Sequence, residues 1–216
     1  MYRFLTVLVF FAVICATNAK AGGTYVSGSF GAGISDNFSG DGSKASFEAD
    51  PDYGYVATAA IGTNVDALPG VRVEMEASWR HNGLGGELIR CKKSYDLNGS
   101  DGTFAAMVNA SYGGVVYGFR PYVMAGAGYG FRRIVLEPTP DNWLTTSSGT
   151  ERAGFVWQAG AGVDYPISED VSVGIGYRYF VAPEIGRIAT FGGKDTFFEA
   201  SGENHAVMAS LIVNLH

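Results

Sequence analysis

Charged side chains alternate with apolar ones along residues 71–80, VRVEMEASWR. One parity holds Arg72, Glu74, Glu76 and Arg80, and the other holds Val71, Val73, Met75, Ala77 and Trp79. A period of two is typical of a β-strand, because successive side chains of a strand point to opposite faces. Glu74 and Glu76 alone would repel each other, and the flanking arginines offset that repulsion. The pattern therefore favours a network of ion pairs on one face of a strand.

A second group of residues has the types used in nucleophilic hydrolysis. Ser78 lies close to His81 in the sequence, and Glu203 lies close to His205. A histidine can activate a serine hydroxyl when an acid orients it. No recognised motif joins these four residues, and isolated histidines are more simply polar residues at an interface. We predict that the protein is not an enzyme, with no catalytic, cofactor or metal site, and keep hydrolysis as an alternative.

The N-terminus has the features of a secretory signal peptide. Arg3 precedes an apolar run over residues 4–16, and a small-residue ending follows at 19–21. A run of roughly 13 residues is shorter than the ~20 that a membrane-spanning helix needs, so we predict a signal peptide over 1–21 and a mature domain over 22–216.

The mature chain is acidic and has a single cysteine. Loss of Arg3 and Lys20 leaves 13 of the 15 basic side chains against 21 acidic ones, a formal charge of −8. Such a balance offers no basic surface for nucleic acid. Cys91 is the one cysteine of residues 22–216, so no disulfide can form within the chain, and without a nearby His or Cys it is no metal site.

Strands and turns account for the rest of the sequence. The chain contains 31 Gly, 12 Tyr and 14 Phe among 216 residues, and no long stretch after the signal keeps a helical apolar period. Segments of period two occur at 24–34, 53–65, 71–80, 103–112, 120–131, 154–165, 170–180 and 205–215. In the last of these, apolar residues occupy both parities, so its facing stays open.

The connections between these segments alternate in length. Long connections cover 35–52, 81–102, 132–152 and 182–204, and short ones cover 66–70, 113–118 and 166–169. An even number of antiparallel strands, with long loops at one end and short turns at the other, is the plan of a membrane β-barrel. Each segment has roughly the 9–11 residues that a tilted crossing requires. We predict an all-β fold, an eight-stranded antiparallel up-and-down transmembrane β-barrel.

The polar face of the strands must point into the barrel. An arginine or lysine facing mid-bilayer lipid costs about 2–4 kcal/mol, whereas a soluble barrel would keep its apolar face inside. The predicted polar network of the lumen comprises Arg72, Glu74, Glu76, Arg80, Arg120, Gln158 and Arg178. Such a network would plug the barrel, since eight strands enclose just enough space for side chains.

Aromatic residues of the apolar face gather toward the end that carries the long loops. The predicted outer girdle comprises Tyr55, Trp79, Phe104, Tyr129, Phe155, Trp157, Tyr177 and Tyr179. Tyr112 and Tyr165 form a sparser set at the other end. Aromatic belts of this kind lie at the headgroup level of a bilayer. The alternative is an aromatic stripe in the core of a β-sandwich, with the charged faces in solvent.

The sequence resembles the small eight-stranded outer-membrane barrels that include the OmpA membrane domain and the opacity-type surface proteins. The resemblance covers the mature chain and rests on GTYVSGSFGAG, RPYVMAGAGYGF, WQAGAGVDYPISEDVSVGIGYRYF and a terminal strand ending LIVNLH. It implies a bacterial outer-membrane protein in contact with lipid and inserted by the barrel-assembly machinery. Such barrels usually end on an aromatic residue, and this chain ends on Leu215 and His216.

Fold alone does not give function. We predict a structural or surface protein, such as a surface antigen, whose four long connections mediate adhesion or other surface contacts. The plainer interpretation of these connections is solvated loops and extensions of the strands above the membrane. A lipid-modifying enzyme, a porin-like channel for small solutes and a soluble periplasmic barrel are the alternatives.

Overall fold

The computed structural model describes residues 23–35, 38–42, 45–90, 93–136, 148–191, 194–200 and 202–215. The predicted signal peptide and Cys91 lie outside these residues. The described strands are β1 (Thr24–Ser35), β2 (Phe38–Gly42), β3 (Ala45–Asn64), β4 (Val71–Arg90), β5 (Lys93–Gly113), β6 (Arg120–Leu136), β7 (Ser148–Pro166), β8 (Val171–Val181), β9 (Ile185–Phe191), β10 (Lys194–Ala200) and β11 (Glu203–Leu215).

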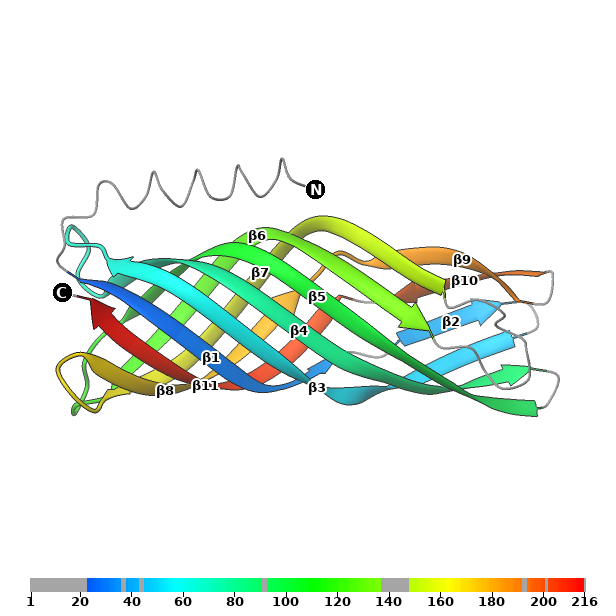
Figure 1. Ribbon diagram of the computed structural model, residues 1–216, viewed down its shortest axis with the longest axis horizontal. Helices are drawn as coiled ribbons and strands as arrows, with labels where there is room; N and C mark the ends of the chain where they lie inside the picture. The colour runs from blue at the N-terminus through cyan, green and yellow to red at the C-terminus, as the bar shows by residue number, and fades with distance from the viewer. Residues whose placement is uncertain are drawn as a thin grey trace.

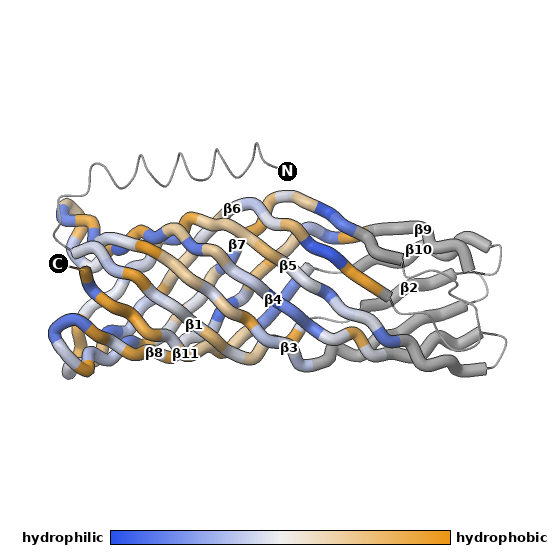
Figure 2. The backbone as a smooth tube through the Cα atoms, in the orientation of Figure 1, coloured by the Kyte–Doolittle hydropathy of each residue, from blue (hydrophilic) through white to orange (hydrophobic). Residues whose placement is uncertain are grey.

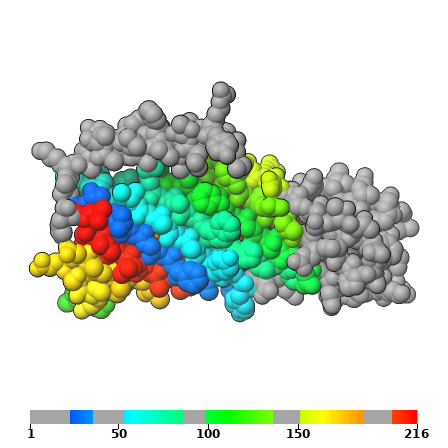
Figure 3. Space-filling view, viewed as in Figure 1, coloured from blue at the N-terminus to red at the C-terminus, as the bar shows by residue number. Residues whose placement is uncertain are grey.

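Eight of these strands close into a barrel, namely β1, β3 to β8 and β11 (Figure 1). Each pairs antiparallel with its neighbours, and β1 closes the ring by pairing with both β3 and β11. Figure 3 shows this seam, with β1 in blue lying against β11 in red. The predicted eight-stranded antiparallel barrel is confirmed. Within the part of the chain described here, no helix has the length and apolar character to cross a membrane.

Side chains alternate between the lumen and the outer wall along each strand. In β1, Ser29 is buried while Phe30 is 64% exposed, and in β4, Arg80 is 1% exposed while Trp79 is 51% exposed. The last strand, whose facing the sequence left open, follows the same rule. Ala206 and Met208 point inward, and Val207 stands on the outer wall. The barrel is therefore inside out relative to a soluble one, with polar groups within and apolar groups outside.

Short turns join the strands at one end, which we call the turn end. They cover residues 65–70, 114–119 and 167–170, within a residue or two of the predicted bounds. The C-terminus of β11 lies at the same end (Figure 1). Figure 2 shows a strongly hydrophilic stretch at the turn between β7 and β8, and hydrophobic residues spread along the strands beyond it.

Strands replace most of the long connections at the opposite end, which we call the hairpin end. β4 and β5 continue as a ladder as far as Arg90 and Lys93, and β6 and β7 remain paired as far as Leu136 and Ser148. β2 pairs with β3, while β9 and β10 form a further hairpin. The expectation of long loops is wrong for these residues, and the alternative interpretation of strand extensions is confirmed for them. The physical reason is that backbone groups need partners, and strands already in register supply them.

Candidate functional site

The lumen collects the charged side chains of the inward parity. Arg72, Glu76, Arg80, Gln158 and Arg178 are each at most 9% exposed. β4 contributes Arg72, Glu76 and Arg80, β7 contributes Gln158, and β8 contributes Arg178. Glu74 and Arg120 are only half-buried. Each strand thus supplies its polar residues at two-residue intervals, and closure of the barrel brings residues from different strands together.

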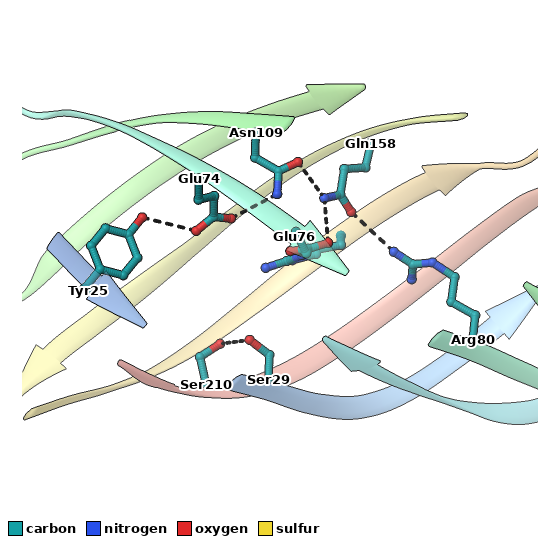
Figure 4. Close-up of polar contacts among 9 residues, drawn as sticks. Tyr25, Ser29, Glu74, Glu76, Arg80, Asn109, Gln158 and Ser210 are labelled. Atoms are coloured by element: carbon teal, nitrogen blue, oxygen red, sulfur yellow. Dashed lines mark hydrogen bonds and ion pairs between the residues drawn. The ribbon is translucent and has the colours of Figure 1, made fainter. Parts of the chain in front are cut away.

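Glu76 is the centre of the network (Figure 4). Its carboxylate forms an ion pair with Arg178, and it accepts a hydrogen bond from Gln158 Nε2 at 3.0 Å. Gln158 Oε1 in turn accepts from Arg80 Nη2 at 3.3 Å. The side chains of Glu76 and Arg178 are 1% and 10% exposed. A buried charge pair of this kind holds only while both partners are present.

A chain of hydrogen bonds continues from this centre toward the turn end. Gln158 Nε2 also donates to Asn109 Oδ1 at 2.9 Å, and Asn109 Nδ2 donates to Glu74 Oε1 at 3.0 Å. The Tyr25 hydroxyl donates to Glu74 Oε2 at 3.1 Å, as Figure 4 shows. These bonds join β1, β4, β5 and β7 across the lumen. Glu74 and Glu76 thereby both have partners, which offsets their mutual repulsion.

A second ion pair lies nearer the turn end. Arg72 Nη2 is 3.1 Å from Asp164 Oδ2, and both side chains are buried. The Arg72 guanidinium also lies 5.6 Å from the ring centre of Tyr25 and 5.7 Å from that of Tyr122, within cation–π range. Arg120 faces Asp164 in the strand register, yet among the described residues it makes no ion pair. Arg72, reaching across the lumen, binds this carboxylate instead.

Apolar side chains surround Arg80 nearer the hairpin end. The Arg80 guanidinium lies 3.9 Å from the ring centre of Phe180, which is itself 1% exposed. Two buried clusters form this layer, one of Ala105, Met107, Val156, Phe180 and Ala182 and the other of Val56, Ala206 and Met208. Arg80 Nε and Nη1 and Ser78 Oγ have no hydrogen-bond partner within the described structure. Arg80 is thus a buried cation held mainly by a ring face and one amide.

A third ion pair lies beyond the apolar layer. Arg132 Nη2 is 2.7 Å from Asp101 Oδ2, and Arg132 Nη1 donates to the carbonyl oxygen of Pro183 at 3.3 Å. Asp101 comes from β5, Arg132 from β6, and Pro183 from the segment after β8. The pair therefore ties that segment to the wall at the hairpin end.

Among the described residues, polar side chains enclose a small cavity in the lumen. A cavity of about 30 Å³ remains toward the turn end, bordered by Tyr25, Ser29, Arg72, Asp164 and Ser210. Since one water molecule needs roughly 10–15 Å³ of such space, the cavity has room for about two. The side chains around this cavity leave no room in it for a solute much larger than water.

Several members of the network were absent from the predicted set. Tyr25, Asn109 and Asp164 all lie on the inward parity of their strands, so the alternation of residues could have identified them. Asp101 and Arg132 fall at the edges of segments that we expected to be loops. Only recognition of the strand extensions would have placed that pair inside the barrel.

The predicted outer girdle lies on the outer wall. Tyr55, Trp79, Phe104, Tyr129, Phe155, Trp157 and Tyr177 are between 39% and 66% exposed, and Tyr179 is half-exposed. Trp79 pairs with Phe104 in the register of β4 and β5, and Phe104 pairs with Phe131 of β6. Trp157 contacts Tyr179 edge-on, with ring centres 5.4 Å apart. The aromatic residues thus form neighbouring rows toward the hairpin end.

The arrangement of Ser78 and His81 does not support hydrolysis. Ser78 is 1% exposed and faces the lumen, whereas His81 has the outward parity and lies 5.3 Å from the ring of Tyr55. The two side chains are on opposite sides of the wall, so the histidine cannot activate this serine. His205 Nδ1 is hydrogen-bonded to the Tyr177 hydroxyl on the outer wall. No group of three potential metal ligands occurs among the described residues.

A family model described as "Outer membrane protein beta-barrel domain" matches residues 4–209 of the chain. Comparison with curated protein sequences gave no match.

Solved structures of outer-membrane barrels have the same fold at low sequence identity. OprG from Pseudomonas aeruginosa aligns with a TM-score of 0.60 and 15% identity, over 91% of this chain and 97% of that one. Neisserial surface protein A aligns with a TM-score of 0.54 and 15% identity, over 91% and 100% of the two chains. The outer membrane protease OmpT from Escherichia coli has a TM-score of 0.51 and 7% identity, over 91% and 98%. Such similarity establishes the architecture and leaves the activity open.

Proposed function

This chain belongs to the family of outer membrane protein beta-barrel domains, and from that membership we propose that it is a closed, non-conducting barrel whose outer hairpins make contacts at the cell surface. Its location is the bacterial outer membrane. In such barrels the short turns face the periplasm and the longer connections face outward. The turn end is therefore periplasmic, and the hairpin end is extracellular.

The filled lumen is the observation that carries the proposal. Glu76 and Arg178 meet across the middle of the barrel, and Phe180 lies over Arg80 in the outer half. Opening a path would require separating a buried ion pair and also repacking an apolar layer. Both steps are costly, since an unpaired buried charge and an exposed apolar core are each unfavourable.

The length of the outer hairpins supports a role at the surface. β4 and β5 contain 20 and 21 residues, whereas a tilted crossing needs about 9–11. At about 3.3 Å per residue, ten surplus residues extend the hairpin by roughly 30 Å. A closed barrel that bears such extensions is suited to hold them at a fixed position above the membrane. Neisserial surface protein A, with the same fold, is a surface protein by name.

The remaining partners follow from location. The outer wall contacts lipid, because its exposed side chains are aromatic and aliphatic. Insertion would use the barrel-assembly machinery. The last described strand that this machinery would meet is β11. Leu215 ends that strand and pairs with Thr24 of β1.

Planar-bilayer recording tests the closed lumen. The barrel purified from membranes should give no steady pores, because the Glu76 network and the Phe180 layer both obstruct the path. Large, stable conductance from the unmutated protein would replace this proposal with a channel.

Shortening the hairpins tests the surface role. We expect cells that produce the protein to aggregate more than cells without it, and removal of residues 85–98 from the β4–β5 hairpin to reduce that aggregation. The matched control replaces Leu68 in the periplasmic β3–β4 turn with Ser, which leaves the outer surface unchanged. A heat-dependent shift in gel migration checks that both variants are folded. Equal aggregation by cells with and without the protein would contradict the proposal.

A further inference from the structure

The periplasmic turn between β5 and β6 has an unusual backbone. Val116 and Phe119 exchange two hydrogen bonds, of 2.8 and 3.0 Å, and so enclose a two-residue loop of Tyr117 and Gly118. Both loop residues have positive φ, 52° and 83°. A hairpin turn of this kind favours Asn or Gly at the first position, because a bulky side chain is strained there. Among the described residues other than glycine, Tyr117 alone has positive φ.

The strained position carries a fully exposed aromatic ring. Tyr117 is 99% exposed, and the preceding Val115 and Val116 are 76% and 51% exposed. Strained backbone persists where the surrounding structure holds it, and it often marks a functional position. The tight turn therefore directs an apolar tip away from the barrel.

Charge separates this turn from the other two periplasmic turns. Residues 112–119, YGGVVYGF, contain no charged side chain. The β3–β4 turn carries Asp66 beside the exposed Leu68, and the β7–β8 turn carries Glu169 and Asp170 beside Ile167. Carboxylates favour water over a membrane surface that contains phosphate groups. Only the β5–β6 turn combines exposed apolar side chains with no such charge.

The apolar tip continues the lipid-facing surface of the barrel. Phe119 packs against Tyr165 of β7, with ring centres 5.2 Å apart, on the outward face. Tyr112 pairs in register with Val123, and both are exposed on the same face. The apolar surface of the outer wall therefore continues from β5, β6 and β7 onto the turn, with only glycines between its apolar side chains.

We propose that the β5–β6 turn inserts into the periplasmic leaflet and anchors the barrel at a fixed depth. Val115 and Val116 would contact the acyl chains close to the headgroups. The Tyr117 ring would lie at the headgroup level, where its hydroxyl meets water and phosphate. The turn contacts the phospholipid interface of the membrane, because its tip is uncharged and continuous with the lipid-facing wall. This inference is independent of what the outer hairpins bind.

Spin labelling measures the depth of the turn directly. In a Cys91→Ser background, nitroxide labels are attached to Tyr117→Cys and to Ser168→Cys of the β7–β8 turn. The purified barrel is reconstituted into vesicles of phosphatidylethanolamine and phosphatidylglycerol. We expect the label at position 117 to be accessible to oxygen and shielded from a water-soluble nickel complex, and the label at 168 to show the reverse. A label at Val73→Cys on the lipid-facing wall provides the buried reference.

Accessibility of position 117 to the nickel complex equal to that of position 168 would overturn the proposal. The turn would then stand in the periplasm, as a contact for another protein or a second copy of the chain. A complementary variant, Tyr117→Asn, relieves the backbone strain while removing the ring. With the label moved to Val115→Cys, we expect this variant to show greater nickel accessibility than the Tyr117 protein and to fold normally, as judged by gel migration. An unchanged accessibility at position 115 would show that Tyr117 is not the anchor.

Discussion

The periplasmic and outer halves of the lumen are closed in different ways. In the periplasmic half, Arg72 binds Asp164, and Glu74 accepts hydrogen bonds from Tyr25 and Asn109, with a small cavity beside them. In the outer half, apolar side chains surround Arg80, which has two N–H groups without partners. Paired charges thus fill the periplasmic half, whereas the outer half combines apolar packing around Arg80, which forms no ion pair among the described residues, with the buried Arg132–Asp101 pair beyond it.

The difference teaches which contacts each half depends on. A paired charge cannot lose its partner without leaving the other charge buried, so the periplasmic and central network should respond strongly to single substitutions. An unpaired charge in an apolar layer has already lost much of its hydration, so its removal should cost little. Packing, by contrast, should control whether water and ions can pass the outer half.

Glu76→Ala should have the largest effect on stability. It leaves Arg178 buried without its carboxylate and removes an acceptor from Gln158, so we expect a loss of about 3–5 kcal/mol in the free energy of unfolding. Urea unfolding in lipid vesicles, followed by tryptophan fluorescence, measures the change. A loss below about 1 kcal/mol would mean that water replaces the ion pair, as at an exposed site.

Phe180→Ala should lower the stability somewhat less than Glu76→Ala does, and it should increase the conductance more. We expect a cost of about 3 kcal/mol, the lower end of the range for such a truncation, because water from the outer opening can fill the space. The same substitution removes the ring from above Arg80 while the Glu76–Arg178 pair still obstructs the middle of the barrel, so planar bilayers should show brief, small conductance steps and no steady pores. If Glu76→Ala conducts and Phe180→Ala does not, the barrier lies in the ion-pair network and the comparison of the two halves is reversed.

Arg80→Met tests whether the unpaired charge is dispensable. The methionine fills similar apolar space and leaves no carboxylate alone, so we expect the free energy of unfolding to change by less than about 1 kcal/mol. Arg178→Met is the matched control, because it leaves Glu76 buried without its guanidinium and should be strongly destabilising. Similar losses from the two variants would show that Arg80 has a charge partner in solution.

Glu151→Ala should have the smallest effect. Its ion pair with Arg133 is 3.5 Å long, and the side chains are 72% and 64% exposed. Solvent and salt screen such a pair, so we expect a change below about 1 kcal/mol that disappears at high ionic strength. Unfolding measured at low and high salt checks this, and a large cost independent of salt would contradict the distinction between buried and exposed pairs.

Much of the fold could be predicted because the relevant signal is local. The alternation of Val171, Val173 and Ile175 with small or polar residues assigns each side chain to one face of the sheet or the other, and it does so without knowledge of any partner strand. Charge then decides which face of the sheet points into the lumen, since Arg72 and Glu76 cannot face lipid. The short turns at 66–70 and 166–169 likewise follow from local Pro and Gly residues.

The length of the strands and the facing of the last one could not be predicted in this way. Residues 81–90 and 93–102 carry turn-like glycines, yet they pair as continuations of β4 and β5 because they extend the register of the barrel segments of these strands. In β11, both Met208 and Val207 are apolar, so composition does not distinguish inside from outside. Pairing with β1 and β8 decides it, placing Met208 opposite Gly31 and Gly176.

The sequence by itself determined the inside-out barrel and the charges of residues 71–80 that line it, because alternation is a property of each strand alone. Only the tertiary structure decided which charges meet. Arg72 binds Asp164 although Arg120 is the register neighbour of that residue, and Arg80 lies against the ring of Phe180 and forms no ion pair among the described residues. The physical reason is that contacts across a closed barrel depend on the tilt and stagger of all its strands together. A period of two carries no information about either quantity.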